Sequence, residues 1–344
     1  MIVGGVPMLF GGASKAVYLA VASIITPFIA AYPWSSAGFG TKFANPATLP
    51  TGEGLGITFN SAGTAIAISH ENTPFVTAYP WSIAGFGTKF SNPGTLPAFH
   101  GNGVAFSPAG TEIAVAHNNS PYVAAYSWSS AGFGTQLSNP GAAVTGNGKG
   151  VAFSPAGTEI AVAHFTAPSI STYPWSSAGF GTKFANPGTA VPDPGFSVAF
   201  SPAGTEIAIG STGATYINAY PWSSAGFGTK FSDPGTLPTG SGFGVAFSPA
   251  GTQIAVAHNI APYVTAYPWS SAGFGTKFSD PGAAVAGTGR DVAFSPAGTE
   301  IVVAHNTTPF VTAYPWSSGG FGTKFADPAT LPTGAGMGVA FGQL

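Results

Sequence analysis

The chain has 344 residues, no cysteine, 6% charged residues and a formal net charge of −2 at pH 7. These numbers exclude disulfides, thiol nucleophiles and thiolate-bound metals, and no basic tract is present to bind nucleic acid. The 44% of hydrophobic residues can fill a large core, while 50 Gly and 31 Pro predict short strands joined by many turns rather than helices.

The tryptophans divide the whole chain into equal units. Successive tryptophans are 47 residues apart without exception: Trp34, Trp81, Trp128, Trp175, Trp222, Trp269 and Trp316. A spacing that never changes indicates one structural unit copied seven times. Seven such units account for nearly all of the chain, so we expect a single domain over residues 1–344.

The apolar N-terminal segment is interpreted as part of the first copy rather than as a signal peptide or a membrane span. It has no basic start, contains Lys15 and is interrupted by Gly and Pro. In addition, residues 18–34 align one for one with residues 112–128. Since no other 18-residue run is free of turn residues, we expect no membrane span in the chain.

The third copy illustrates four predicted strands. Residues 104–106 form the first strand, and Ser107-Pro108-Ala109-Gly110 has the Pro and Gly positions of a tight turn. Residues 112–117 alternate between two faces and form the second strand. Residues 122–128 form the third strand and residues 133–137 the outer fourth strand.

Four antiparallel strands in each 47-residue repeat, copied seven times, predict an all-β fold, a seven-bladed β-propeller. The Gly-x-Gly run before each first strand fits the crowding near a central axis. A lysine recurs on the predicted fourth strand, where a charge would block pairing with another molecule. These lysines are Lys42, Lys89, Lys183, Lys230, Lys277 and Lys324.

Ring closure has two candidate strands, because first-strand patterns occur eight times. Residues 6–10 and residues 338–341 both match, and the C-terminal version matches the repeat better because the N-terminal one contains Pro7. We predict that residues 338–341, within the terminal segment 336–344, form the innermost strand of the first blade. The N-terminal segment 1–14 is then displaced or pairs elsewhere.

Variation between copies concentrates in the second turn and in the loop that joins blades, which should lie on one face around a mouth of the channel. One position there ranges from cation to aromatic although its neighbours are constant: Leu55, Asn102, Lys149, Phe196, Phe243, Arg290 and Met337. Exposed aromatic residues beside arginine are typical contact anchors. These seven residues are the candidate binding site, with neutral drift at a loop position as the alternative.

The recurring VAFSPxG segment, followed by a hydrophobic strand and a strand that ends in a Trp-containing dipeptide, resembles the WD-repeat propeller family. The dipeptide is Trp-Ser rather than Trp-Asp, and the Gly-His pair of that family is absent. The nearly identical blades, each with a segment like YPWSSAGFGTKF, also resemble amplified propellers of bacteria and of tailed-phage virion or tail proteins.

No catalytic residue, metal site or cofactor is predicted. Histidine recurs at one repeat position, and a structural hydrogen bond near the second turn is expected there: His70, His117, His164, His258 and His305. Equivalent positions in different blades are too far apart for one metal ion. No pair of acids in one pocket is indicated, and Arg290 and Asp291 are interpreted as a loop salt bridge.

Three functions are compatible with these features. The preferred one is a non-enzymatic component of a larger assembly, such as a phage virion or tail, located on the virion or outside the cell, with other proteins as partners. The first alternative is a glycan-binding propeller with repeated sites, in which the tryptophans stack on sugars. The second is a propeller hydrolase or lactonase, for which the sequence lacks a recognisable metal-binding cluster.

Overall fold

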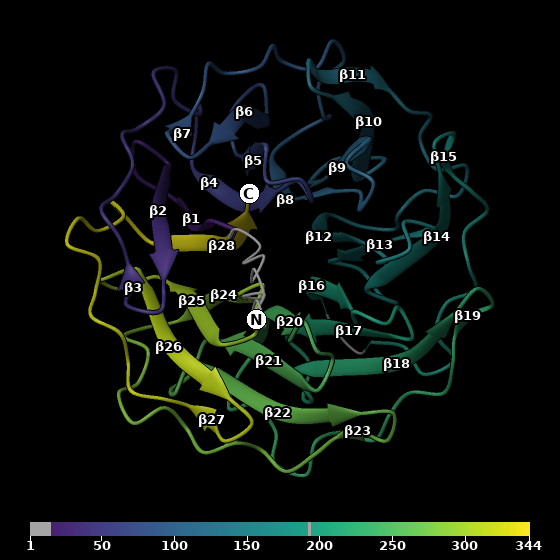
Figure 1. Ribbon diagram of the computed structural model, residues 1–344. Helices are drawn as coiled ribbons and strands as arrows, with labels where there is room; N and C mark the ends of the chain where they lie inside the picture. The colour runs from purple at the N-terminus through teal and green to yellow at the C-terminus, as the bar shows by residue number, and fades with distance from the viewer. Residues whose placement is uncertain (1–14, 192–193) are drawn as a thin grey trace, which may run out of the picture.

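The computed structural model describes residues 15–191 and 194–344, and these residues form 28 β-strands and no helix. The strands lie in seven sheets of four, and neighbouring strands in each sheet are antiparallel. The sheets surround a common centre like the blades of a propeller (Figure 1). The predicted all-β seven-bladed propeller is therefore confirmed. Blade 1 contains Trp34, and the blades are numbered along the chain.

Strand bounds repeat closely from blade to blade. The innermost strands of blades 1 to 7 are β28 (Gly336–Gln343), β4 (Gly54–Phe59), β8 (Gly101–Phe106), β12 (Gly148–Phe153), β16 (Gly195–Phe200), β20 (Gly242–Phe247) and β24 (Gly289–Phe294). The second strands are β1 (Val17–Ser23), β5 (Ala65–His70), β9 (Glu112–His117), β13 (Glu159–His164), β17 (Glu206–Ser211), β21 (Gln253–His258) and β25 (Glu300–His305). The third strands are β2 (Ile29–Ser35), β6 (Val76–Ser82), β10 (Val123–Ser129), β14 (Ile170–Ser176), β18 (Ile217–Ser223), β22 (Val264–Ser270) and β26 (Val311–Ser317). The fourth strands are β3 (Gly38–Phe39), β7 (Gly85–Phe86), β11 (Gly132–Gln136), β15 (Gly179–Phe180), β19 (Gly226–Phe227), β23 (Gly273–Phe274) and β27 (Gly320–Phe321).

The first turn of blades 2 to 7 has the predicted tight geometry, whereas in blade 1 no turn joins the first two strands because β28 comes from the C-terminus. In blade 3, the Gly110 amide donates to the Ser107 carbonyl at 2.8 Å, and Gly110 has a φ of 68°, in the left-handed region that favours glycine. The Ser107 hydroxyl accepts a hydrogen bond from the Glu112 amide at 3.1 Å. The turn residues therefore fix the register in which the first two strands pair.

The fourth strand is shorter than predicted in six of the seven blades, and proline explains the difference. In blade 2, Pro80 of β6 accepts a hydrogen bond from Gly87 at 2.8 Å, so the side of Pro80 that faces β7 has an acceptor but no N–H donor. The ladder ends there, and β7 has only two residues. Blade 3 has Ser127 at this position, and its fourth strand, β11, has five residues.

The recurring lysines therefore lie beyond the fourth strand, not on it as predicted. Lys183 is half-buried and donates to the Asn186 side chain at 3.0 Å. The equivalent lysines of blades 5, 6 and 7 form ion pairs with the aspartate three residues later: Lys230–Asp233, Lys277–Asp280 and Lys324–Asp327. Each lysine thus holds the loop that leads to the next blade.

Ring closure follows the C-terminal prediction. The sheet of blade 1 has the order β28-β1-β2-β3, so the innermost strand comes from the C-terminus. Val21 pairs with Val339, and Leu19 pairs with Phe341. The competing strand, residues 6–10, lies outside the described residues.

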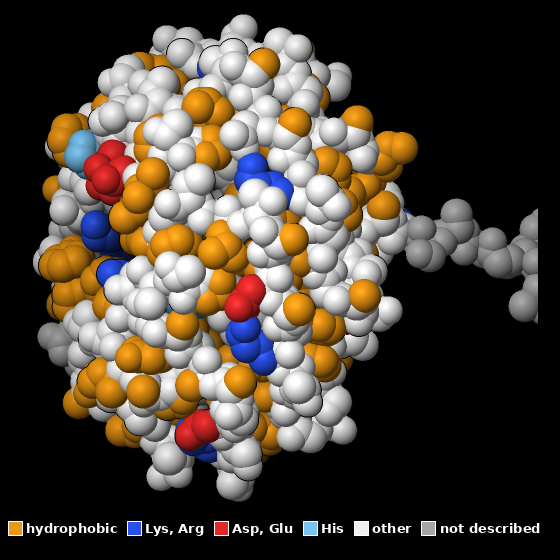
Figure 2. Space-filling view, turned by 90° about the vertical axis from the view of Figure 1, so that its left-hand side faces the viewer, with side chains coloured by type: hydrophobic (Ala, Val, Ile, Leu, Met, Phe, Trp, Pro, Cys, Tyr) orange, Lys and Arg blue, Asp and Glu red, His pale blue; other side chains and the backbone are white. Residues whose placement is uncertain are grey.

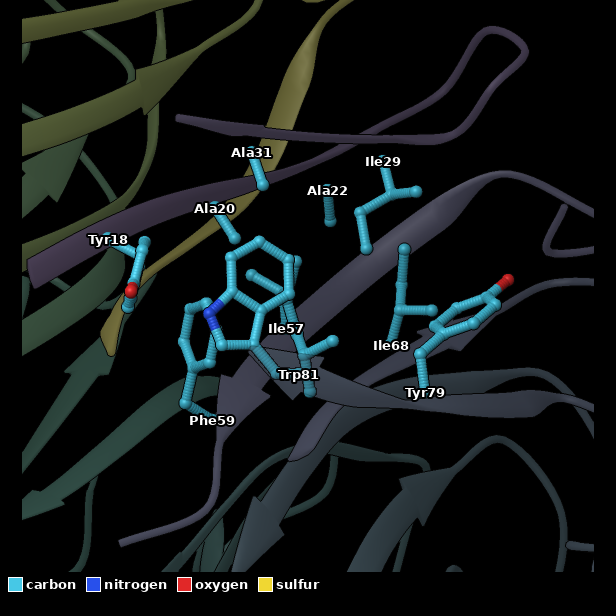
Figure 3. Packing of buried hydrophobic residues seen from close by; sticks show 11 residues of the cluster. Tyr18, Ala20, Ala22, Ile29, Ala31, Ile57, Phe59, Ile68, Tyr79 and Trp81 are labelled. Atoms are coloured by element: carbon cyan, nitrogen blue, oxygen red, sulfur yellow. The ribbon is translucent and has the colours of Figure 1, made fainter. Parts of the chain in front are cut away.

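The core lies between blades, and a tryptophan is at the centre of each contact. Trp81 packs on Tyr18 and Phe43 of blade 1 at centroid distances of 5.3 and 5.1 Å. It also packs on Phe59 and Phe86 of its own blade at 5.3 and 4.9 Å. Figure 3 shows its indole near Phe59 and Ile57, with Tyr18 and the small alanines Ala20 and Ala31 in the same cluster. No tryptophan is more than 7% exposed, so the indoles do not form the sugar-stacking surface considered above.

The surface carries few charges. Figure 2 shows scattered hydrophobic side chains in a largely uncharged envelope, with isolated blue and red groups. Since the described part of the chain contains no helix, none is available to cross a membrane.

Candidate functional site

All seven residues of the candidate site line one central cavity. Each is the second residue of an innermost strand, and together they enclose a volume of about 270 Å³: Leu55, Asn102, Lys149, Phe196, Phe243, Arg290 and Met337. The structure therefore brings together residues that are 47 positions apart in the sequence. Whether they bind a ligand stays a prediction.

A β-bulge explains why this position faces the cavity. In blade 3, Gly101 pairs with His117 and Gly103 pairs with Ala116, so Asn102 is an extra residue outside the ladder. The same shift occurs in the other six blades. A bulge re-aims the side chain of its extra residue. The position varies between copies because its side chain takes no part in the sheet.

The loops around the cavity also meet as predicted. In blade 2, the second turn and the incoming loop exchange hydrogen bonds: Thr51 Oγ1 donates to the Thr73 carbonyl at 2.7 Å, and Asn72 Nδ2 donates to the Thr51 carbonyl at 3.0 Å. These two loops therefore form one face, where the innermost strands begin.

Four consecutive blades contribute an arc of cations and aromatic rings. The order around the ring is Lys149, Phe196, Phe243 and Arg290, because β12, β16, β20 and β24 are successive neighbours. The two phenylalanine rings are in edge-to-face contact, with centroids 5.0 Å apart. The Arg290 guanidinium carbon lies 5.1 Å from the centre of the Phe243 ring. Across the cavity, Met337 and Leu55 are apolar.

Lys149 is held by a small polar network. Its ammonium donates to Asn118 Oδ1 at 3.2 Å, and Asn102 Nδ2 donates to the same oxygen at 2.7 Å. Asn102 Nδ2 also donates to the Gly148 carbonyl at 2.6 Å. Burial lowers the pKa of Lys149 from its ordinary value, and the same cause lowers the pKa of Arg290. Both cations thus lie at the cavity, and the surrounding residues shield them partly from water.

Asp291 is a further site residue that sequence analysis interpreted wrongly. It is the third residue of β24, not a loop residue, and its carboxylate accepts hydrogen bonds from the Val292 and Val339 amides, both at 2.9 Å. Among the described residues, ion pairs are confined to the three lysine–aspartate pairs named above, so the predicted salt bridge with Arg290 is absent. Asp291 also lines the cavity.

The environment of Asp291 raises its pKa to about 6 through burial, which the two amide hydrogen bonds only partly offset. A comparison of the copies could have singled out Asp291, because the third residue of the innermost strand is glycine in five of them. The exceptions are Ser197 and Asp291. Ser197 Oγ accepts a hydrogen bond from the Val245 amide at 3.2 Å, so both side chains bond to the innermost strand of the next blade.

The recurring histidines are structural, as predicted, and four of them also bridge the second and third strands. All five are completely buried. His258 Nε2 lies 2.9 Å from the hydroxyl of Thr265 on the third strand, and His70, His164 and His305 make the equivalent contact. Within residues 15–191 and 194–344, no group of three metal-binding side chains occurs.

Three solved structures resemble this chain over nearly its whole length. The periplasmic gluconolactonase of Pseudomonas aeruginosa is 16% identical, with 95% of this chain and 99% of that chain covered at a TM-score of 0.72. A 6-phosphogluconolactonase candidate of Bacteroides uniformis is 12% identical, with coverages of 95% and 99% and a TM-score of 0.77. Another from Bacteroides fragilis is 13% identical, with coverages of 96% and 98% and a TM-score of 0.70.

The chain shares its seven-bladed propeller fold with these three proteins. At these identities the likeness establishes the fold alone. No protein-family model matches the chain, and no curated protein matches its sequence.

These comparisons correct the preferred function from sequence analysis. The prediction of a non-enzymatic virion or tail component is wrong, because chains with the same fold from end to end carry the names of lactone-hydrolysing enzymes. The resemblance to WD-repeat and phage proteins, which rested on short recurring segments, has no support among the comparisons. Segments such as VAFSPxG reflect the turn chemistry of a blade, and unrelated propellers share that requirement.

Proposed function

We propose that this protein hydrolyses a lactone in the central cavity, with Asp291 as the general base. The observation that carries the proposal is a partly buried carboxylate with a pKa of about 6 that lines the same cavity as two cations. A base with a pKa near the working pH combines the correct protonation state with effective proton transfer. The names of the structural neighbours support the same reaction class.

The reaction would begin when Asp291 removes a proton from a water molecule that attacks the lactone carbonyl carbon. The carbonyl oxygen becomes an oxyanion, for which Lys149 or Arg290 supplies positive charge. The ring C–O bond then breaks, and the protonated Asp291 returns the proton to the departing alkoxide. The product is the open hydroxy acid, and the enzyme recovers its original protonation state.

The seven cavity residues would bind the substrate in this proposal. A volume of about 270 Å³ is at the lower end of the range for small-molecule pockets, so the substrate is a small molecule. We also propose a location outside the cytoplasm, since one structural neighbour is named as periplasmic. Protein and glycan partners stay predictions.

Hydrolysis of D-glucono-1,5-lactone and δ-valerolactone in a pH-stat tests the function. After subtraction of spontaneous hydrolysis, the wild-type protein should show turnover that rises with pH through about 6, because the base must be ionised. Asp291→Asn should lower kcat by about 100-fold or more. Lys183→Gln, at a residue outside the cavity lining, should leave kcat unchanged.

Absence of turnover with these two lactones and with the aromatic lactone 3,4-dihydrocoumarin, or an unchanged rate in Asp291→Asn, would contradict the proposal. Thermal unfolding of Asp291→Asn separates loss of the base from loss of the fold. An asparagine oxygen can accept from only one of the Val292 and Val339 amides, and its NH2 group then faces the other N–H donor, so a lower melting temperature is expected and kcat is measured well below it.

A further inference from the structure

We infer that the cavity selects an amphipathic anion: a ligand with an apolar or aromatic body and a carboxylate or phosphate group. This deepens the proposed function and rests on it for the statement that the ligand is a lactone. The inference concerns substrate class, and it separates this cavity from one built for a neutral polyhydroxylated lactone.

The charge of the cavity favours an anion. Its lining contains two cations, Lys149 and Arg290, and one carboxylate, Asp291. Neither cation has a carboxylate within 4.0 Å among the described residues, since the ion pairs there join other lysines to aspartates. The Nε–H of Arg290 is buried and has no acceptor. A chain with only nine Lys and Arg thus places two of them, unpaired, at one cavity. Cations left without a counter-charge in a partly dry site attract an anionic ligand.

The aromatic groups favour an apolar body between the cations. Phe196 and Phe243 lie in adjacent blades between the blades of Lys149 and Arg290, with their rings in contact at 5.0 Å. Phe165, which is 47% exposed, extends this surface at 5.8 Å from Phe196, and the Lys149 ammonium lies 5.6 Å from its ring centre. Rings in this arrangement offer faces and edges to an aromatic or aliphatic group.

The remaining lining offers little to a polyol. Opposite the arc, Leu55 and Met337 are apolar, and the amide of Asn102 already donates to Asn118 and to the Gly148 carbonyl. On this side of the cavity a polyhydroxylated ring would find few partners to replace its hydrogen bonds to water, which disfavours its binding. A ligand with one charged end and one apolar end fits this lining, because the cations can bind its charged end and the aromatic and aliphatic side chains can pack on its apolar end.

Isothermal titration calorimetry with three probes tests the inference without any requirement for turnover. The probes are 3-phenylpropionate, D-gluconate and 3-phenylpropan-1-ol, which carry respectively both features, only the negative charge, and only the aromatic body. We expect 3-phenylpropionate to bind at least about fivefold more tightly than either of the others, and more weakly as salt rises.

Variants assign the two features to residues. Arg290→Gln and Lys149→Gln should each weaken 3-phenylpropionate about tenfold and leave 3-phenylpropan-1-ol nearly unchanged. Phe243→Leu should weaken both aromatic probes by about threefold or more. The controls are Lys183→Gln and Phe99→Leu, because neither residue lines the cavity and Phe99 is as exposed as Phe165. Both controls should bind like the wild type.

Equal or tighter binding of D-gluconate, or no binding of any probe, overturns the inference. Its failure is distinct from that of the proposed function. Preferential binding of 3-phenylpropionate without lactone turnover removes the reaction and supports the ligand class. Turnover of gluconolactone, with gluconate as the tightest-binding probe, supports the reaction and removes the proposed ligand class.

Discussion

At the residue scale, the buried histidines show how one repeat position is satisfied differently in different blades. Four of them contact a threonine or serine hydroxyl on the third strand. In blade 5 the pair is replaced by Ser211 and Asn218, which bond to each other at 3.2 Å. In blade 3 the partner position is Ala124, so His117 lacks the hydroxyl partner that the other histidines have. An unsatisfied buried polar group costs stability.

The substitution Ala124→Thr should therefore stabilise the protein by about 1 kcal/mol, because it supplies His117 with the hydroxyl that the other blades have. Thr265 occupies the equivalent position with 1% exposure, so the blade contact accommodates the larger side chain. Chemical denaturation measures the change. Thr265→Ala is the matched control and should destabilise by a similar amount. A loss of stability in Ala124→Thr would show that packing at blade 3 outweighs the hydrogen bond.

The same histidines predict acid sensitivity. Burial lowers the pKa of each of the five to about 4. In the unfolded chain they take up protons below about pH 6.5, so the unfolded state binds more protons between pH 6.5 and 4. Stability is complete above this window and falls with pH inside it, by up to about 1.4 kcal/mol per pH unit for each histidine.

Asp291 acts in the opposite direction, since its raised pKa reduces stability as pH rises towards 6. One carboxylate set against five histidines leaves a net loss on acidification. Calorimetric melting from pH 7 to 4.5 should show it, and His258→Ser, which introduces the residue found in copy 5, should reduce the slope by about one proton. A melting temperature independent of pH over this range would contradict the burial of these rings.

At the element scale, the innermost strand carries both structure and site. Its first and third residues are glycine in most blades because neighbouring backbone is too close for a side chain. A Cβ on Gly101 would lie 2.4 Å from the Phe75 carbonyl, and one on Gly103 would lie 2.8 Å from the Lys149 carbonyl. The bulge between them turns the second residue into the cavity. One short segment thus combines close packing with a freely variable functional position.

The β28 strand gives the element-scale prediction. Deletion of residues 336–344 removes the innermost strand of blade 1 and uncovers Leu19, Val21 and Trp34, which pack in one cluster with Val339. The melting temperature should fall by about 10 °C or more, because several buried side chains lose their contacts. Deletion of residues 1–14 is the comparison of similar length and should cost much less. An equal fall in melting temperature in the two deletions would contradict closure of the ring by β28.

At the scale of the whole molecule, closure depends on identical contacts repeated around the axis. A Cβ on Gly101 of blade 3 would lie 2.4 Å from the Phe75 carbonyl of blade 2, and one on Gly336 of blade 1 would lie 2.4 Å from the Phe310 carbonyl of blade 7. The seam between the first and last blades therefore has nearly the same spacing as an ordinary contact. A template without insertions produces seven equivalent interfaces, and only then do the seven second residues share one cavity.

The sequence by itself determined the number of blades, the four-strand unit and the position that varies between copies. These follow from periodicity, turn residues and alternation, which act over a few residues. Only the tertiary structure decided the length of the fourth strand, the burial of the tryptophans and the place of Asp291 in the same cavity lining as the two cations. Those features depend on contacts between blades, such as the bond from the Val339 amide to Asp291 across 48 positions. A pattern over a few residues does not specify which residues far apart in the sequence will be in contact in the folded protein.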